Sequence, residues 1–372
     1  MKYRLFGNTG LRVSEFAIGT MTFGTERIWG ATKDENRRIF DAFVEAGGNF
    51  FDTADGYMAG GSEQMLGEFI AGERERYVIG TKYSFAKRPG DPNSGGNHRK
   101  NMVQALEGSL SRLGVDYVDV YWVHAWDQMT PVEEVMRALD DLVRSGKILH
   151  IGISNAPAWV VSYANATAHC RGWTTFAGLQ IEYSLIERTP ERELIPMAAE
   201  LGVTLVAWSP LGGGFLSGKY IRNQKPTDGR VAQFIYTELS DTNFDIADAV
   251  KAIAAELGYT PAQVALAWLR QKGALPIVGA RTLAQIKENL GAADLVLGTA
   301  HMDRLNDVTA ASLGYPHDFL QAQMVRERLH AGSYDRIDRV SKSVLSPVVS
   351  RPSSMTRFAG AGPQGNGHAR PS

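Results

Sequence analysis

Four residues whose side chains could together move a proton lie at or shortly after the ends of three successive β-rich runs: Asp52, Tyr57, Lys82 and His124. A tyrosine hydroxyl ordinarily ionises near pH ~10 and is a poor proton donor at neutral pH. A neighbouring ammonium stabilises the phenolate, and a carboxylate beside that ammonium keeps it charged and in place. A histidine can donate a hydrogen bond to a substrate oxygen. The set would therefore deliver a proton to a carbonyl oxygen that is becoming negative.

The carbon of such a carbonyl must receive a hydride, and no side chain supplies one, so the set implies a nicotinamide or flavin cofactor. Taken singly, each residue also has a structural explanation, as a loop cap, a wall aromatic, a solvated strand end or a core histidine. One shared site explains four such residues more simply. A second reaction stays open, in which Lys82 is a Schiff-base nucleophile of a lyase. The histidines form no HxxxH or HExxH pair, so a metal site has little support.

Short β-rich runs alternate with longer amphipathic stretches along the chain. The pattern predicts eight strands, at residues 16–21, 49–53, 77–82, 117–124, 150–154, 177–182, 203–208 and 275–279. It predicts helices at 34–46, 63–71, 98–113, 131–145, 158–168, 191–201, 261–272 and 282–290. Eight strand–helix units favour a (β/α)8 TIM barrel of the α/β class. A doubly wound sheet is the rival, but no GxGxxG follows the first strand.

In a barrel the carboxyl ends of the strands meet around one mouth, where barrel active sites lie. The four residues above would meet there, with further residues from the other strand ends: Thr20, Ser154, Asn155, Gln180, Trp208, Ser209 and Arg281. Residues 3–14 are expected to form an N-terminal β-hairpin. Residues 209–243 contain no clear strand and lead to an extra helix near 245–258, and loops this long are usually binding loops, lids or disordered segments.

The bulk properties are those of one large α/β body. The chain has 372 residues, a net charge of −1, 44% hydrophobic and 21% charged residues. The near-neutral charge argues against a dedicated nucleic-acid binder, and no run of about 18 apolar residues is present to span a membrane. The N-terminus lacks the apolar core of a signal peptide, and the single cysteine, Cys170, allows no internal disulfide. We therefore expect a cytoplasmic protein.

Residues 341–372 differ in composition from the rest of the chain, with seven Ser, four Pro, four Gly, four basic residues and no acidic residue. Such a segment buries too little apolar surface to offset the entropy cost of ordering it. We expect a barrel domain at 1–340 and a low-complexity, disordered tail at 341–372, the alternative being an arm that docks on a partner subunit. Without the tail the net charge is near −5, since −1 − 4 = −5.

Over roughly residues 1–320 the sequence resembles the aldo-keto reductase superfamily. The resemblance rests on the order and strand placement of these motifs: Phe51-Asp52-Thr53-Ala54-Asp55-Gly56-Tyr57, Gly80-Thr81-Lys82, Leu110-Ser111-Arg112-Leu113-Gly114-Val115-Asp116-Tyr117-Val118-Asp119, His124, Ile151-Gly152-Ile153-Ser154-Asn155, Gln180-Ile181-Glu182-Tyr183-Ser184 and Ala207-Trp208-Ser209-Pro210-Leu211. It implies a barrel that uses NADPH without a Rossmann domain and reversibly reduces an aldehyde or ketone to an alcohol. Some relatives of this fold are subunits of larger assemblies, so a non-catalytic, nicotinamide-binding regulatory subunit is the alternative.

The resemblance also implies roles for the four residues of the proton-transfer set. Tyr57 looks like the general acid that gives a proton to the carbonyl oxygen. Lys82 looks like the residue that lowers the proton affinity of the tyrosine, with Asp52 paired to it. His124 looks like the residue that orients the carbonyl.

Further positions match the family's cofactor contacts. Ser154, Asn155 and Gln180 match positions that hold the carboxamide of nicotinamide, and hydroxyl and amide side chains suit that group because it needs a donor and an acceptor. Trp208 matches an aromatic position that stacks on the nicotinamide ring. Arg281 precedes the last barrel helix and would hold the 2′-phosphate of NADP. Many members carry a basic residue where Gln285 stands, so NADH is the alternative cofactor. The expected cofactor contacts are Thr20, Asp52, Ser154, Asn155, Gln180, Trp208, Ser209, Pro210, Leu211, Gly213, Lys219, Gly279, Ala280, Arg281, Gln285, Glu288 and Asn289.

Four apolar residues on the loops after strands one, two and four are expected to line the substrate pocket: Phe23, Trp29, Met58 and Trp126. A bulky carbonyl compound, such as an aryl aldehyde or a polycyclic ketone, would suit that lining. The expected partner is this small-molecule carbonyl or alcohol, with no nucleic acid and no membrane, and the oligomeric state is not predicted.

Overall fold

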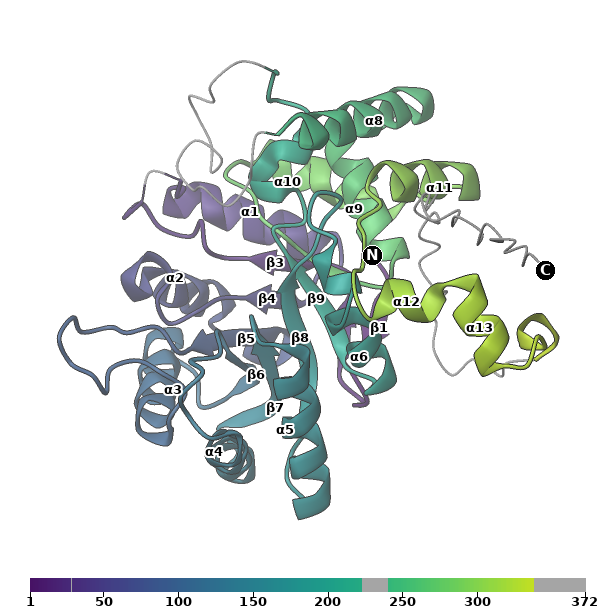
Figure 1. Cartoon of the computed structure of the whole chain (residues 1–372). Helices are drawn as coiled ribbons and strands as arrows, with labels where there is room; N and C mark the ends of the chain where they lie inside the picture. The colour runs from purple at the N-terminus through teal and green to yellow at the C-terminus, as the bar shows by residue number, and fades with distance from the viewer. Residues whose placement is uncertain (28, 223–239, 338–372) are drawn as a thin grey trace, which may run out of the picture. The chain divides into compact units, whose positions relative to one another are not determined.

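The computed structural model describes residues 1–27, 29–222 and 240–337 (Figure 1). The described chain divides into two compact units, residues 1–310 and residues 311–337. The expected tail at 341–372 and the middle of the 209–243 segment lie outside the described residues. None of the helices in the described part is long and apolar enough to cross a membrane.

Eight parallel strands close into a barrel in the first unit, in the order β10-β3-β4-β5-β6-β7-β8-β9 (Figure 1). All eight predicted strand positions are confirmed, and so is the (β/α)8 fold. The strands are β3 (Ala17–Gly19), β4 (Phe50–Asp52), β5 (Val78–Tyr83), β6 (Val118–Val123), β7 (Ile148–Ser154), β8 (Phe176–Glu182), β9 (Thr204–Trp208) and β10 (Leu275–Val278).

The helices between these strands follow from amphipathic sequences with defined ends. In α4, for example, Val135, Met136 and Leu139 are buried on one face, and acidic residues occupy the first turn. The first unit contains α1 (Lys33–Glu45), α2 (Gly61–Ile70), α3 (Arg99–Leu113), α4 (Val132–Arg144), α5 (Ala158–Arg171), α6 (Leu194–Glu200), α8 (Asp241–Leu257), α9 (Pro261–Gln271), α10 (Leu283–Leu290) and α11 (Thr299–Val308). The second contains α12 (His317–Gln321) and α13 (Gln323–Leu329). The expected extra helix is α8, which begins four residues before the predicted position because Ser240 caps it.

The predicted N-terminal hairpin is also confirmed, as β1 (Tyr3–Leu5) paired antiparallel with β2 (Arg12–Ser14). Phe6, in the connection between them, is fully buried and packs edge-on against Phe50 and Trp122 of the barrel interior. These residues belong to one apolar core with Val120 and Leu275. The core fills the barrel below its mouth, as expected of a packed barrel rather than a pore.

Strand alternation separates the core-facing from the helix-facing side chains. Phe51 of β4 packs outward against Phe40 and Phe43 of α1. The next residue, Asp52, therefore faces the barrel interior, and Lys82 faces it from β5. Polar residues at the carboxyl ends of the strands thus lie above the apolar core and face one another.

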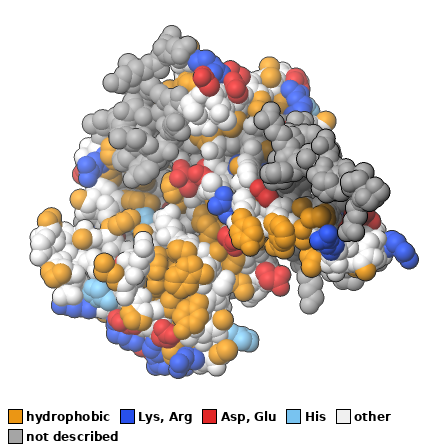
Figure 2. Space-filling model, viewed as in Figure 1, with side chains coloured by type: hydrophobic (Ala, Val, Ile, Leu, Met, Phe, Trp, Pro, Cys, Tyr) orange, Lys and Arg blue, Asp and Glu red, His pale blue; other side chains and the backbone are white. Residues whose placement is uncertain are grey.

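An exposed apolar patch lies over α5. Figure 2 shows hydrophobic side chains gathered near α5, where Trp159 and Tyr163 are 64% and 47% exposed. Met197 of α6 lines the same surface groove.

Candidate active site

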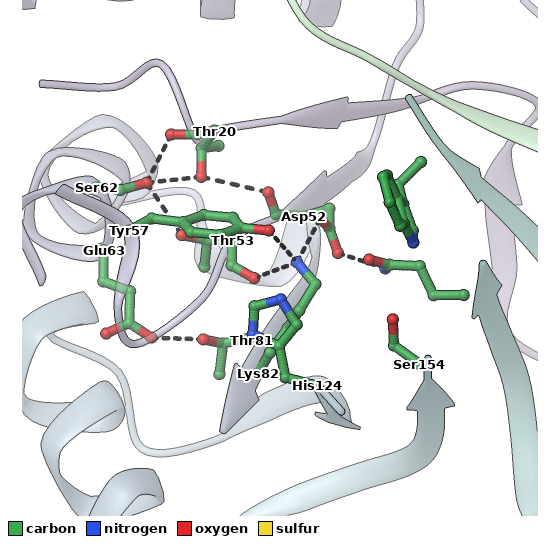
Figure 3. A network of polar contacts seen from close by, with 12 residues as sticks. Thr20, Asp52, Thr53, Tyr57, Ser62, Glu63, Thr81, Lys82, His124 and Ser154 are labelled. Atoms are coloured by element: carbon green, nitrogen blue, oxygen red, sulfur yellow. Dashed lines mark hydrogen bonds and ion pairs between the residues drawn. The ribbon is translucent and has the colours of Figure 1, made fainter. Parts of the chain in front are cut away.

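Lys82 is the centre of a buried polar cluster (Figure 3). Its Nζ lies 2.6 Å from Asp52 Oδ2, 2.8 Å from the Thr53 carbonyl oxygen and 3.2 Å from the Tyr57 hydroxyl. Lys82 is fully buried and Asp52 is 3% exposed. The structure therefore brings the predicted aspartate, tyrosine and lysine into direct contact.

The local backbone explains how Tyr57 reaches this cluster. Asp52 of β4 is in register with Gly80 of β5, which places Lys82 above it on the same side of the sheet. After β4 the chain reverses through residues 54–60, in which Met58 and Ala59 have φ of +48° and +53°. Left-handed backbone at non-glycine residues is uncommon and is often found at functional sites.

The charges of the cluster support one another. Burial opposes the positive charge of Lys82, but Asp52 and Tyr57 outweigh burial and raise the pKa of Lys82 above its usual value. Burial raises the pKa of Asp52, and the contacts with Lys82 and Gln180 oppose that rise. Lys82 therefore carries a positive charge next to the Tyr57 hydroxyl, where it would stabilise a phenolate.

His124 completes the set from the end of β6. Its ring lies edge-on to the Tyr57 ring at 5.9 Å between centroids (Figure 3). Burial, and then the charge of Lys82, hold the pKa of His124 well below its usual value of 6.5. The imidazole is therefore neutral at physiological pH. Its buried Nδ1 has no hydrogen-bond partner among the residues that the structure describes.

Phe85 is an aromatic neighbour that the sequence reasoning missed. Its ring lies 4.6 Å from the His124 ring, and the side chain is 54% exposed. The signal was an aromatic three residues beyond Lys82, on the loop after β5. Phe85 thus adds an accessible apolar surface beside the imidazole.

The residues expected to hold a carboxamide are connected to one another. Asn155 Nδ2 donates to Ser154 Oγ and to the His124 carbonyl oxygen, both at 2.9 Å. Trp208 Nε1 donates to Asn155 Oδ1 at 3.2 Å. Gln180 Nε2 donates to Asp52 Oδ1 at 2.9 Å. Asn155 is exposed, whereas Ser154 and Gln180 are 0% and 2% exposed, so only part of this set faces the mouth.

A second buried network of hydrogen bonds adjoins the Lys82 cluster and was not predicted. Ser62 Oγ lies 2.8 Å from Thr20 Oγ1 and 3.1 Å from Thr53 Oγ1 (Figure 3). The fully buried carboxylate of Glu63 accepts from Thr81 and pairs with Arg112 at 2.7 Å. Thr20 is fully buried within this network, where its hydroxyl helps to fix the strand ends, and its expected contact with a cofactor stays a prediction.

The glycine-rich loop after β9 contains a short 3-10 segment, Gly212–Ser217. Ser209 has φ of +53°, and its carbonyl and hydroxyl oxygens accept from the amides of Gly212 and Gly213 at 2.8 and 3.0 Å. Gly212, Gly213 and Gly214 all have positive φ. Their observed role is to permit this turn, because these amides already bond within the loop. The other residues expected here are Pro210, which is buried, Leu211, which is half-buried, and Lys219, which is exposed.

The predicted phosphate-binding segment precedes α10. Thr282 caps this helix by accepting from the Gln285 amide at 3.3 Å, and the Arg281 amide donates to Gln285 Oε1 at 2.8 Å. Asn289 Nδ2 donates to the Gly279 carbonyl oxygen at 3.2 Å. Gly279, Gln285 and Glu288 are exposed, Arg281 is half-buried, and Ala280 and Asn289 are buried. A basic side chain thus lies at a helix N-terminus, where an anion is favoured.

The predicted substrate-pocket residues divide into two pairs. Trp29 and Trp126 are partly exposed. Phe23 is fully buried against Phe69, and Met58 is 5% exposed. Phe23 and Met58 are therefore core residues and not pocket walls, because the loop after β3 and the turn after β4 each fold an apolar side chain inward.

Known proteins that are similar to this chain show its family. Residues 15–310 match the family described as "Aldo/keto reductase family". The chain is 37% identical over 323 residues to norsolorinic acid reductase stcV of Emericella nidulans, covering 84% of this chain and 82% of the relative.

Two further relatives have similar coverage. The aryl-alcohol dehydrogenase [NADP(+)] of Phanerodontia chrysosporium is 34% identical over 350 residues, covering 88% of this chain and 91% of the relative. The uncharacterized oxidoreductase YrpG of Bacillus subtilis is 37% identical, covering 83% of this chain and 96% of the relative. The chain therefore belongs to the aldo/keto reductase family, a family of oxidoreductases.

Proposed function

We propose that this protein is an NADPH-dependent carbonyl reductase that converts an aldehyde or ketone to the alcohol, reversibly, with Tyr57 as the proton donor. The observation that carries the proposal is the contact of a charged, fully buried Lys82 with both Asp52, at 2.6 Å, and the Tyr57 hydroxyl, at 3.2 Å. The ammonium stabilises the phenolate that remains when the Tyr57 hydroxyl gives up its proton. Neutral His124 donates a hydrogen bond to the substrate oxygen and holds it near that hydroxyl.

The lyase alternative has no comparable support. A Schiff-base nucleophile must be a neutral amine with a free lone pair. Lys82 Nζ instead bonds to three oxygens, and the pKa of Lys82 is raised. The regulatory-subunit alternative predicts nicotinamide binding without turnover, so the activity test below separates it from the reductase.

The residues at the mouth fit a nicotinamide dinucleotide by their chemistry. When bound, the cofactor supplies the hydride that no side chain can provide. The exposed Asn155 amide and the Trp208 ring would hold its nicotinamide end, and Arg281 its 2′-phosphate. The buried Ser154 and Gln180 stay proposed contacts, which a carboxamide would reach only if neighbouring side chains shift. NADP(+) appears in the name of one relative, which favours NADPH over NADH for this chain.

We further propose an aromatic carbonyl substrate. Phe85, Trp29 and Trp126 offer partly exposed aromatic surface, and Phe85 lies against His124. Such surfaces favour flat aromatic ligands. The names of two relatives, an aryl-alcohol dehydrogenase and a norsolorinic acid reductase, agree with this class.

The test follows the absorbance of NADPH with benzaldehyde and with cyclohexanecarboxaldehyde, which share a six-membered ring and an aldehyde but differ in aromaticity. We expect turnover of both, with a higher kcat/KM for benzaldehyde. Binding of NADPH, seen as fluorescence quenching, without turnover of any aldehyde or ketone in a broad panel would favour the regulatory alternative. Equal kcat/KM values for the matched pair would contradict the aromatic preference.

The cofactor preference has its own test. Arg281→Ala should weaken NADPH binding far more than NADH binding, because only NADPH has a 2′-phosphate. Lys287→Ala removes an exposed positive charge from the same helix and is the matched control. Equal losses for both cofactors in Arg281→Ala would contradict the phosphate role.

A further inference from the structure

Gln180 and Asp52 join opposite walls of the barrel. They lie on β8 and β4, which are four strands apart in a closed ring of eight. The bond from Gln180 Nε2 to Asp52 Oδ1 is 2.9 Å long and links residues 128 positions apart in the chain. Both residues are at most 3% exposed, so water does not compete for this bond.

The donors and acceptors fix the orientation of both groups. A carboxylate only accepts hydrogen bonds, so the nitrogen of the Gln180 amide must face Asp52. The other carboxylate oxygen, Oδ2, accepts from Lys82 Nζ at 2.6 Å. Each oxygen of Asp52 therefore has its own donor, one from each side of the barrel.

We propose that Gln180 is a positioning residue for the proton relay formed by Asp52, Lys82 and Tyr57. Gln180 holds the Asp52 carboxylate so that Oδ2 is presented to Lys82. This inference rests on the proposed function, because it assigns to the relay a residue that the family resemblance assigns only to the cofactor. Gln180 stabilises the ionised carboxylate by a charge-assisted hydrogen bond. Asp52 in turn keeps Lys82 charged beside Tyr57.

The surroundings of Asp52 define what the loss of Gln180 would do. The charged or titratable groups around it are Lys82 from β5, Tyr57 from the turn after β4 and neutral His124 from β6 (Figure 3). Without the Gln180 donor, one carboxylate oxygen would be buried with no donor, which favours protonation of Asp52. Protonated Asp52 no longer supports the charge of Lys82.

The first test measures unfolding without cofactor or substrate, so it is independent of any activity. Gln180→Met keeps the side-chain length and removes the donor. In the unmodified protein it should lower the folding equilibrium constant about five- to tenfold, but about twofold or less in an Asp52→Asn background. Ser154→Ala, a buried neighbour whose hydroxyl bonds to Asn155, is the control and should have equal effects in both backgrounds. Equal effects of Gln180→Met in both backgrounds would overturn the proposal.

The second test is the pH dependence of kcat/KM. Gln180→Met should move the acid limb about one pH unit upward, since one charge-assisted hydrogen bond to Asp52 is lost. Gln180→Glu places a second carboxyl group against Asp52 and should move the acid limb further upward. This variant replaces Gln180→Met in the test if Gln180→Met does not fold. A weaker NADPH affinity with an unmoved acid limb in these variants would show a cofactor-contact role only and would overturn the proposal.

Discussion

Lys82 depends for its charge mainly on its contact with Asp52. A buried ammonium is normally disfavoured, and the pKa of Lys82 is raised only because Asp52 and Tyr57 outweigh burial. The same contact accounts for the proposed acid, since a neutral lysine would not stabilise the Tyr57 phenolate. The electrostatics of the relay therefore lie in three side chains held by two neighbouring strands and one turn.

Asp52→Asn tests this dependence. It leaves Lys82 buried without its counter-charge, which should cost about 3 kcal/mol of the free energy of unfolding. The alkaline limb of kcat/KM against pH should move to lower pH, because the carboxylate no longer raises the pKa of Lys82. Urea unfolding and a pH–rate series measure both effects. Asp41→Asn, which removes an exposed partner of Arg37, is the control, and an unmoved alkaline limb in Asp52→Asn would contradict the account.

Glu182, at the end of β8, has a strongly raised pKa. Burial, and then the neighbouring Glu187, raise the pKa of Glu182 from 4.5 to about 7. The folded protein therefore binds a proton between pH 5 and 7 that the unfolded chain does not, and stability rises as the pH falls through 7. Because Glu182 is partly exposed, Glu182→Gln should stabilise by roughly 1 kcal/mol at pH 8 and by almost nothing at pH 5. Denaturant unfolding at pH 8 and pH 5 measures this stabilisation. An equal gain in the free energy of unfolding at both pH values would contradict the raised pKa.

The four residues of the proton-transfer set could be predicted because their residue types and their positions at strand ends can be read from the sequence. The sequence could not predict Gln180 bonding to Asp52, since that contact joins opposite sides of a closed barrel. Ser62 and Glu63 were also missed, because hydroxyl and carboxyl groups on a helix usually face solvent. Phe23 was misplaced because an aromatic residue on a loop can fold inward as readily as it can line a pocket.

One large side chain on β6 sets the shape of the barrel interior. Trp122 is fully buried, and glycines on three nearby strands lie beside its ring: Gly80, Gly152 and Gly178. A Cβ at any of these glycines would collide with the Trp122 ring. The indole therefore uses the space that these strands leave open beneath Lys82 and Gln180.

Gly152→Ala should be destabilising for this reason. The added methyl group overlaps the Trp122 ring in a packed core, and such overpacking costs about 1–3 kcal/mol. Gly10→Ala is the matched control, because nothing lies within 4 Å of its Cβ position, and it should change stability by less than about 0.5 kcal/mol. Thermal unfolding of both variants measures this, and equal midpoints would refute the packing account.

The order of strands and helices was predictable because the barrel repeats one strand–helix pattern, and each strand is buried on both faces. Helix ends were predictable where a cap marks them, as with Thr260 and Pro261 at the start of α9. The directions of side chains within loops were less predictable. Met58 is an example, because it lies in a turn with positive φ, which changes the direction in which its side chain points.

For the whole molecule, we propose that the functional part of the chain ends before the expected tail. The family match ends at residue 310, and all of the proposed site residues lie between 20 and 289. A chain that ends at residue 340 should keep kcat/KM within about twofold, because it retains every proposed contact. Steady-state assays of both lengths test this, and a large loss in the shorter chain would assign the tail a role in activity.

Tyr57 is the proposed proton donor. The most direct measurement compares Tyr57→Phe with the unmodified protein in single-turnover reduction of an aldehyde that the latter reduces, together with NADPH affinity from fluorescence quenching. The variant keeps the ring beside His124 and loses only the hydroxyl that contacts Lys82. We predict that reduction slows about 10²–10⁴-fold while NADPH affinity stays within about twofold. Full turnover by Tyr57→Phe would contradict the account.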